Sequence, residues 1–447
     1  MSNEQLAISN ESQTRQMKDS GVEWIGEMPE SWEISRLKRF AETHFGGCWG
    51  DDAKGNENDI LCIRIADFDF SSQTVKKSAS TLRNYTQAQI EKGLLEDGDL
   101  IIEKSGGGDK TPVGRVVIYD KSIFPKAMFA NFSECLRPKN IINKYLAYQL
   151  KALYYTVDMH YYFNQTTGLQ NLDMQAYLNA LMCFPPLDEQ QTIASYLDRK
   201  CTQIDTLIAN QQQQIEKLKA YKQSVITETV TKGLDPDVAM KDSGVEWIGE
   251  IPCTWSVVYL SSIVTERKHK NEGMKENNLL SLSYGKVVRK NINTSDGLLP
   301  ANFEGYNIIE LGDIVLRLTD LQNDHTSLRT GLSKERGIIT SAYVTLNVNN
   351  DIFISEYLHY LLHSFDCCKG FYGMGAGVRQ GLNFDGIKKI EILMPEKKEQ
   401  QQIAEYLDQK CEQIDRLIAI KQQKIEKLQQ YKKSLIYEYV TGKKEVI

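Results

Sequence analysis

A stretch of 43 residues that occurs twice limits the fold of this chain more than any other feature. The copies span residues 189–231 and 399–441, align without a gap, and are identical at 29 of 43 positions. In each copy, apolar residues return at alternating three- and four-residue steps, which is the a/d pattern of a coiled-coil helix. Each copy is therefore predicted to form one long helix.

The apolar positions of the two copies define the expected contact surface between the helices. They are Leu197, Cys201, Ile204, Ile208, Ile215 and Leu218 in the first copy, and Leu407, Cys411, Ile414, Ile418, Ile425 and Leu428 in the second. Polar residues interrupt this seam at Gln211, Lys222, Lys421 and Lys432, and such residues cost stability but fix register and partner. We expect the two helices to pack on each other. The alternative is that each is a separate amphipathic helix on its own domain.

A second repeat precedes each half of the chain. The sequence MKDSGVEWIGE begins at Met17 and returns at Met240. Glycine and proline punctuate the segments 17–32 and 240–255, and tryptophans supply apolar anchors. We call these segments the first and second strap. Two interpretations are open: a strap pins its domain to another part of the molecule, or it forms a turn on the domain's own surface.

The regions between strap and helix share an order of elements but few residues. The first region has β-like runs at 59–65, 99–102 and 113–119 and a helical pattern at 144–155; the second has runs at 278–283, 313–317 and 338–346 and a helical pattern at 354–363. A Gly-Asp turn stands at corresponding places, at Gly98-Asp99 and Gly312-Asp313. This contrast indicates one mixed α/β fold present twice, with a different ligand for each copy.

Composition narrows the class of protein without naming a function. A chain of 447 residues is too long for one ordinary core and suggests at least two domains. The nine cysteines are scattered without a C-x-x-C pair, which favours a reducing cytoplasm over a disulfide framework or structural zinc. No apolar run is long enough to span a membrane, and the first residues do not resemble a secretory signal. The net charge of −6 is concentrated around the straps, so it neither supports nor excludes a DNA-binding surface.

Catalytic and cofactor motifs are absent from the pattern of residues. The segment 106–111, GGGDKT, lacks the adjacent Gly-Lys-Thr of a phosphate loop, and the glycine-rich segment 371–377 follows a helical pattern instead of a strand. Asp99, Glu103 and Lys104 lack the spacing of a nuclease metal site, and the histidines form no zinc motif. The sequence therefore predicts no catalytic residue, no metal site and no cofactor in this chain.

Two pairs of polar loops remain as candidate DNA-binding segments. Arg, Lys, Gln, Asn, Thr and Asp side chains can meet base edges in a major groove, and glycine lets the backbone approach phosphate. The candidates in the first half are Lys104, Ser105, Lys110, Thr111, Arg115, Gln165, Thr166, Thr167, Gln170 and Asn171. Those in the second half are Arg317, Thr319, Asp320, Gln322, Asn323, Arg379 and Gln380. Each loop alone is typical of a solvated surface, but the repeated pattern suggests readers of two different short sequences.

The straps, the junction Pro185-Pro186-Leu187-Asp188-Glu189-Gln190 and the doubled helix resemble the specificity subunit of type I restriction–modification enzymes. The resemblance covers residues 17–441. It implies two target recognition domains joined by paired helices, and a bipartite double-stranded DNA target with an unspecified spacer. It also implies two methylation subunits that use S-adenosylmethionine, and restriction subunits, bound through the methylation subunits, that use ATP and Mg²⁺. The specificity subunit itself has no active site in this family.

These inferences predict an α+β chain: two similar sheet-containing domains separated by two long helices that form an antiparallel coiled coil, related by a pseudo-twofold axis. The expected segments are a tail at 1–16, a first recognition domain with its strap at 17–187, a first helix at 188–233, a second recognition domain with its strap at 234–397, and a second helix at 398–447. Two other classes stay open. A fused DNA methyltransferase or nuclease would show turnover by the chain alone, and a coiled-coil scaffold with two protein-binding heads would lack sequence-specific DNA binding.

Overall fold

The computed structural model divides the chain into two compact units, which we describe separately. Unit 1 comprises residues 1–212 and 423–447, and unit 2 comprises residues 213–422. The structure describes residues 15–166, 168–292, 300, 302–321, 328–372, 374 and 381–446. Each unit therefore contains a portion of both long helices. The division predicted from sequence differs, because it treats each long helix as a segment separate from the domains.

The two repeated stretches form the two longest helices, as predicted. Helix α4 (Leu187–Lys232) has 46 residues and helix α7 (Lys397–Val440) has 44. In unit 1, Tyr196 of α4 hydrogen-bonds Tyr439 of α7, and Asp205 binds Lys432. Residue numbers rise along one helix as they fall along the other, so the segments are antiparallel.

The same antiparallel pairing holds in unit 2, where Gln214 of α4 accepts a hydrogen bond from Lys421 of α7 and Lys222 pairs with Asp415. The predicted packing of the two copies on each other is thus confirmed within each unit. Of the seam residues, Leu197, Cys201, Ile204, Ile215, Leu407, Cys411, Ile414 and Ile425 are buried, and Ile208, Leu218, Ile418 and Leu428 are half-buried.

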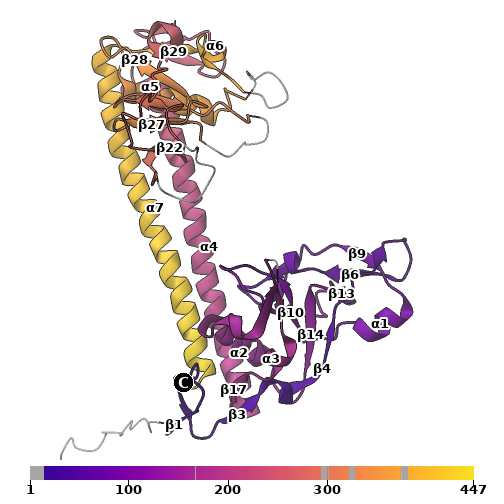
Figure 1. Cartoon of the computed structure of the whole chain (residues 1–447). Coiled ribbons are helices and arrows are strands. Elements are labelled where there is room, and N and C mark those ends of the chain that lie inside the picture. The colour runs from indigo at the N-terminus through magenta and orange to yellow at the C-terminus, as the bar shows by residue number, and fades with distance from the viewer. Residues whose placement is uncertain are drawn as a thin grey trace, which may run out of the picture. The chain divides into compact units, whose positions relative to one another are not determined.

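Unit 1 is built around a sheet that helix α2 (Asn143–Thr156) covers on one face. The strands of this sheet, in spatial order, are β4 (Ala41–Gly46), β14 (Ser133–Pro138), β10 (Leu100–Glu103), β12 (Val116–Ile118), β8 (Thr74–Val75) and β7 (Phe68–Asp69). Helix α2 also contacts α4, where Tyr148 donates a hydrogen bond to Asp198 at 2.9 Å (Figure 1). The buried core of unit 1 therefore runs from the sheet through α2 to the long helices.

Smaller elements complete unit 1. A second sheet contains, in order, β13 (Ala127–Phe129), β6 (Asp59–Ile63), β9 (Leu82–Asn84) and β5 (Asp51–Asp52); a third contains β11 (Ser105–Gly106), β16 (Leu169–Leu172) and β15 (Phe163–Thr166). The remaining strand pairs are β1 (Met17–Asp19) with β2 (Glu27–Pro29), and β3 (Glu33–Arg36) with β17 (Leu181–Phe184). Two short helices, α1 (Gln87–Gly93) and α3 (Met174–Leu178), flank these sheets (Figure 1).

Unit 2 repeats the plan of unit 1 with fewer strands among its described residues. Its main sheet contains, in order, β21 (Val264–Glu266), β28 (Val344–Val348), β25 (Ile314–Leu316) and β26 (Thr330–Leu332), with helix α5 (Ser355–Cys367) in the place of α2. Its strand pairs are β18 (Met240–Asp242) with β19 (Glu250–Pro252), β20 (Ser256–Tyr259) with β29 (Glu391–Met394), β22 (Leu280–Ser283) with β23 (Lys286–Arg289), and β24 (Asn307–Ile309) with β27 (Gly337–Ile339). Helix α6 (Phe384–Ile387) precedes β29.

The predicted strands and helices recur with one correction. The run 338–346 was expected to be one strand, but the chain turns after Ile339, so the run is divided between β27 and β28. The expected Gly-Asp turns are present, with φ of +83° at Gly98 and +86° at Gly312, a backbone conformation that favours glycine. Periodicity identified the apolar residues, but it did not reveal where the chain reverses.

Each strap holds its domain to the ends of the long helices. The Trp32 indole N–H donates to Glu189 at the start of α4 in unit 1, and the Trp255 indole donates to Glu399 at the start of α7 in unit 2. In unit 1, Lys443 beyond the end of α7 donates to the carbonyl of Ile25 at 2.7 Å. The first interpretation of the strap, a segment that pins its domain to another part of the molecule, is the one that the contacts support.

Candidate nucleic-acid interface

Two candidate loops of unit 1 that are distant in sequence meet in one small sheet. Strand β11 pairs with β16, so that Ser105 lies opposite Asn171 and Gly106 opposite Gln170. The Ser105 hydroxyl donates to the Asn171 side chain at 2.7 Å. The backbone N–H of Leu172 also donates to the Lys104 carbonyl at 2.8 Å. The hairpin β15–β16 and the segment after β10 therefore present their polar residues together.

Six candidate residues of this sheet and its loops reach the surface. Lys110, Thr111, Gln165 and Asn171 are exposed, and Lys104 and Ser105 are half-exposed. The Lys104 ammonium pairs with Glu134 at 2.8 Å while more than a third of its side chain is exposed, 38%. An ammonium in this position is available to phosphate or to a base edge once a ligand competes with Glu134.

Arg115 and Gln170, two other candidates, make bonds within the domain. The Arg115 guanidinium grips Glu103 with bonds of 2.7 and 2.8 Å and lies 3.8 Å from the centroid of the Phe70 ring. Burial alone would lower the pKa of Arg115, but the bond to Glu103 raises it above its ordinary value. Gln170 has no exposed surface, and its side-chain amide oxygen accepts a hydrogen bond from the backbone N–H of Val113 at 3.2 Å. Gln170 is therefore shielded from DNA in this fold. Arg115 stays a candidate reader, because its side chain is half-exposed and its guanidinium carries more N–H donors than its two bonds to Glu103 use.

Several candidates cannot be placed. Thr167, Gln322, Asn323, Arg379 and Gln380 lie outside the described residues, and of Thr166 only the backbone in β15 is described.

The described candidates of unit 2 lie on the segment that follows β25. Arg317 is half-exposed, Thr319 is exposed and Asp320 has a φ of +57°. The buried guanidinium of Arg329 donates to the backbone carbonyls of all three residues, and these bonds hold the turn in place from inside the domain. The next residue along the chain from Arg317, Leu318, accepts a 2.8 Å bond from Leu382, as Lys104 does from Leu172 in unit 1. The two units thus build their candidate surfaces at the same place in the fold.

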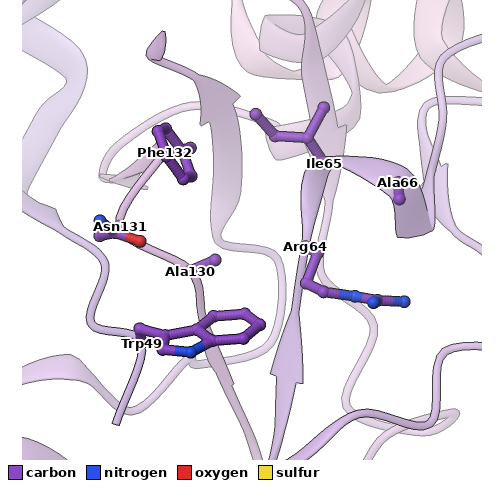
Figure 2. Close-up of a pocket in the computed structure, with 7 residues that line it drawn as sticks. All are labelled: Trp49, Arg64, Ile65, Ala66, Ala130, Asn131 and Phe132. Carbon is purple, nitrogen blue, oxygen red and sulfur yellow. The ribbon is translucent and has the colours of Figure 1, made fainter. Parts of the chain in front are cut away.

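An aromatic pocket borders the candidate surface of unit 1. It has a volume of about 510 Å³ and is lined by Trp49, Arg64, Ile65, Ala66, Ala130, Asn131 and Phe132. Figure 2 shows the Trp49 indole and the Phe132 ring bordering it, with Ile65, the first residue of the 3-10 turn Ile65–Asp67, across from Phe132. The Phe132 carbonyl accepts from the backbone N–H groups of both Lys104 and Ser105, at 2.9 and 3.0 Å. The pocket and the polar sheet are therefore neighbours.

Sequence reasoning missed the aromatic residues of this pocket. Phe132 and Trp49 are 54% and 41% exposed, and an exposed aromatic side chain cannot be told from a core residue by its pattern. In unit 2, the corresponding turn places Ala342 where unit 1 has Phe132, because the turns 340–343 and 130–133 carry the same backbone bond. Aromatic faces stack on bases at about 1–3 kcal/mol each, so the change from Phe132 to Ala342 distinguishes the two surfaces at this turn.

Two acidic residues near this surface, Asp99 and Glu103, are paired with arginine. The Arg137 guanidinium donates two hydrogen bonds to the Asp99 carboxylate, at 2.9 and 2.8 Å, and the Arg115 guanidinium donates to the Glu103 carboxylate. No group of three or more histidine, cysteine, aspartate or glutamate side chains in the described part of the chain could hold a metal ion. Nor does any helix of that part have the length and apolarity to cross a membrane.

Comparison with known proteins identifies the class. The sequence matches the family described as the type I restriction modification DNA specificity domain, twice, over residues 29–217 and 255–430. The chain belongs to this family and is a specificity subunit of the type I restriction–modification class.

Two relatives and one solved structure extend the match along the chain. A putative type I restriction enzyme MjaX specificity subunit of Methanocaldococcus jannaschii is 27% identical over 94% of this chain and 95% of its own. The type I restriction enzyme MjaVIII specificity subunit of the same organism is 26% identical over 93% of each chain. A chain from a structural study of complex assembly and conformational transition in a type I restriction–modification system shares the fold, with a TM-score of 0.65, 12% identity, and coverage of 92% of this chain and 98% of that chain.

Proposed function

We propose that each recognition domain of this specificity subunit reads one half of a bipartite DNA sequence. One observation carries the proposal: the two units share the strand order of their main sheets, but the residues on their corresponding surfaces differ. In unit 1 this surface carries Lys104, Asn171 and the aromatic pair Trp49 and Phe132; in unit 2 it carries Arg317 and Thr319. A shared frame with different polar side chains suits two readers of unlike sequences.

The finer parts of the proposal come from the family. The paired helices set the spacer between the half-sites and dock two methylation subunits, which in turn bind restriction subunits. The chain contributes no catalytic residue. The other subunits supply the sites for S-adenosylmethionine, ATP and Mg²⁺. Preparations of this chain alone are then expected to show no cleavage, methylation or ATP hydrolysis.

Competition binding tests the assignment of the surfaces to half-sites. The complex of this chain with its methylation subunits is bound to a labelled target duplex and challenged with duplexes altered in one half at a time. Lys104→Ala and Phe132→Ala should lose discrimination at one half-site only, and Arg317→Ala at the other. Lys121→Ala removes an exposed lysine after β12 and serves as the matched control. Equal weakening on every duplex would mean that these side chains hold phosphates and do not read bases.

The role of the helices is tested by their length. Four residues inserted after Glu228, near the end of α4, add about 6 Å to the helix. One base pair rises about 3.4 Å, so the preferred spacer should grow by one or two base pairs while both half-site sequences stay the same. Mapping of methylated adenines for the insertion variant measures both. Activity on the original spacer, or altered half-sites, would refute this role.

The alternative is a scaffold whose two domains bind proteins and not DNA. It predicts that the complex does not distinguish its target duplex from duplexes of unrelated sequence, which the same competition experiment measures.

A further inference from the structure

Unit 2 contains a cavity whose counterpart in unit 1 is filled. The cavity has a volume of about 920 Å³ and lies where α5 and the unit 2 segments of α4 and α7 meet the hairpin β22–β23. Its lining includes Lys222, His359, His363 and the edge-strand residue Leu332.

In unit 1, the chain's own segment 68–75 occupies the corresponding place. This segment forms β7 and β8, the two strands that the main sheet of unit 1 has in addition to the four it shares with unit 2. The Gln73 carbonyl accepts from the backbone N–H of Ile118 on β12 at 2.9 Å. Two residues earlier, the Ser71 carbonyl accepts from the ammonium groups of Lys432 at 2.9 Å and Lys151 at 2.7 Å. An extended segment is thus held by a strand edge and by helix lysines.

The matching donors line the cavity of unit 2. Leu332 pairs with Ile314 as Ile118 pairs with Leu100, so Leu332 stands at the place of Ile118 on the outer edge of the sheet. No strand among the described residues pairs with that edge of β26, and an unpaired strand edge is a template for another chain. Lys222 occupies the position in the repeat that Lys432 occupies in unit 1. Its partner Asp415 likewise corresponds to Asp205, the partner of Lys432.

The charges of the lining indicate the kind of partner. In unit 1, Lys144 pairs with Asp198; in unit 2, Glu356 and Asp408 stand at these places, with Glu412 beside them in the lining. The lysines of the lining, Lys222, Lys286 and Lys334, are on other segments than Glu356, Asp408 and Glu412. These three carboxylates favour a cationic group at their end of the cavity.

We propose that this cavity is a peptide-binding site, in which an extended, basic segment of a partner polypeptide adds to the edge of β26. One backbone carbonyl of the segment accepts from the Leu332 N–H, and the carbonyl two residues earlier accepts from Lys222. A lysine or arginine of the segment meets the carboxylates of Glu356, Asp408 and Glu412. Strand addition of this kind draws its affinity from main-chain hydrogen bonds.

A peptide copied from unit 1 is the probe. The synthetic peptide FDFSSQTVK reproduces residues 68–76, and a second version replaces its Asp69 by lysine. Fluorescence anisotropy with the full-length chain should show saturable binding of both. The lysine version should bind more tightly, and added salt should weaken it more, because its added charge can meet Glu356, Asp408 and Glu412.

Two substitutions of matched chemistry locate the peptide. Lys222→Met removes the helix donor and should weaken binding about tenfold, as expected for a hydrogen bond to a charged group. Lys421→Met makes the same change on the same helix pair of unit 2, but Lys421 does not line the cavity, so affinity should not change. Hydrogen exchange of the unsubstituted chain gives an independent readout: the peptide should slow exchange at 328–334.

Three results would overturn the proposal. They are no binding at millimolar peptide, equal binding to the Lys222→Met and unsubstituted chains, and protection confined to segments outside the cavity. A fourth result would also overturn the proposal, by showing that a second copy of the chain occupies the cavity. If light scattering shows a dimer that the peptide dissociates, the cavity belongs to self-association and not to a partner.

Discussion

The two units differ most where the outer edge of their main sheets meets the long helices. In unit 1, the strands β7 and β8 cover this edge, and Lys432, 6% exposed, lies buried between Asp205 and the Ser71 carbonyl. In unit 2, the same edge borders a cavity, and the side chain of Lys222 remains 25% exposed beside Asp415. One repeated ion pair is therefore internal in one unit and partly solvated in the other.

This difference can be set against the parts of the repeat that are the same in both units because they hold the structure together. The bonds that hold helix ends recur in both units: Tyr145 donates to the Val440 carbonyl in unit 1, and Tyr357 donates to the Val230 carbonyl in unit 2, both at 3.2 Å. Residues that do not hold helix ends or form the core can change freely, because their replacement does not disturb the frame. Edges and surfaces are accordingly where the units have diverged.

The largest expected effect compares the two ion pairs. Asp205→Ala should cost unit 1 about 2–4 kcal/mol, because it leaves the buried ammonium of Lys432 without its carboxylate. Asp415→Ala should cost unit 2 only about 0–1 kcal/mol, since water reaches that pair. Urea unfolding, followed by hydrogen exchange of α2 and α5 separately, measures both. Equal losses would contradict the difference in burial.

The covering segment of unit 1 gives a smaller effect. The Gln73 side chain donates to the Ala147 carbonyl at 2.8 Å, and Gln73 is 5% exposed. Gln73→Ala should cost about 1 kcal/mol, because it removes the hydrogen bond that ties this segment to α2. Exchange should then accelerate in β8 and α2, and not in α5. The neighbouring Ser72→Ala is the control, since Ser72 is exposed.

The pH dependence should also separate the units. Burial, helped by the neighbouring His363, lowers the pKa of His359 from 6.5 to about 3; burial, helped by Lys222, lowers that of His363 to about 4. Below pH 6.5 the unfolded chain binds protons that the folded unit 2 does not, so unit 2 should lose stability as pH falls from 6.5 towards 4. His359→Leu should reduce the fall in Tm between pH 7 and pH 5. An unchanged fall would contradict the burial of this imidazole.

Unit 1 should respond in a different pH window. Burial, followed by the charge of Lys432, lowers the pKa of Lys151 from 10.5 to about 7. Between pH 7 and 10.5 the unfolded chain holds the proton that folded unit 1 has released, so this group adds stability as pH rises through that range. Comparison of Lys151→Met with the unsubstituted chain at pH 7 and pH 9 measures the contribution. The variant should lack it.

The helices and the straps could be predicted from sequence because repetition marks them. Heptad periodicity identified the contact surface between α4 and α7, and the repeated tryptophan pointed to an anchor. The roles of Arg115 and Gln170 could not be predicted. A guanidinium or an amide suited to a base edge suits Glu103 or a backbone N–H equally well, and only the tertiary fold decides which partner it meets. The exposure of Trp49 and Phe132, and the open edge at β26, depend on the tertiary fold in the same way.

The central claim is that each unit reads one half of a bipartite site. Its most direct test changes only two surface side chains of unit 1. Methylated adenines are mapped across the genome of cells that carry this chain with its methylation subunits, unsubstituted or as the double variant Lys104→Ala and Asn171→Ala. A lost base contact costs about 1–3 kcal/mol, so the variant should accept new bases at one or two positions of one half-site. The other half-site and the spacer should stay as they were. Relaxation of both halves alike, or no change in the mapped sequence, would contradict the account.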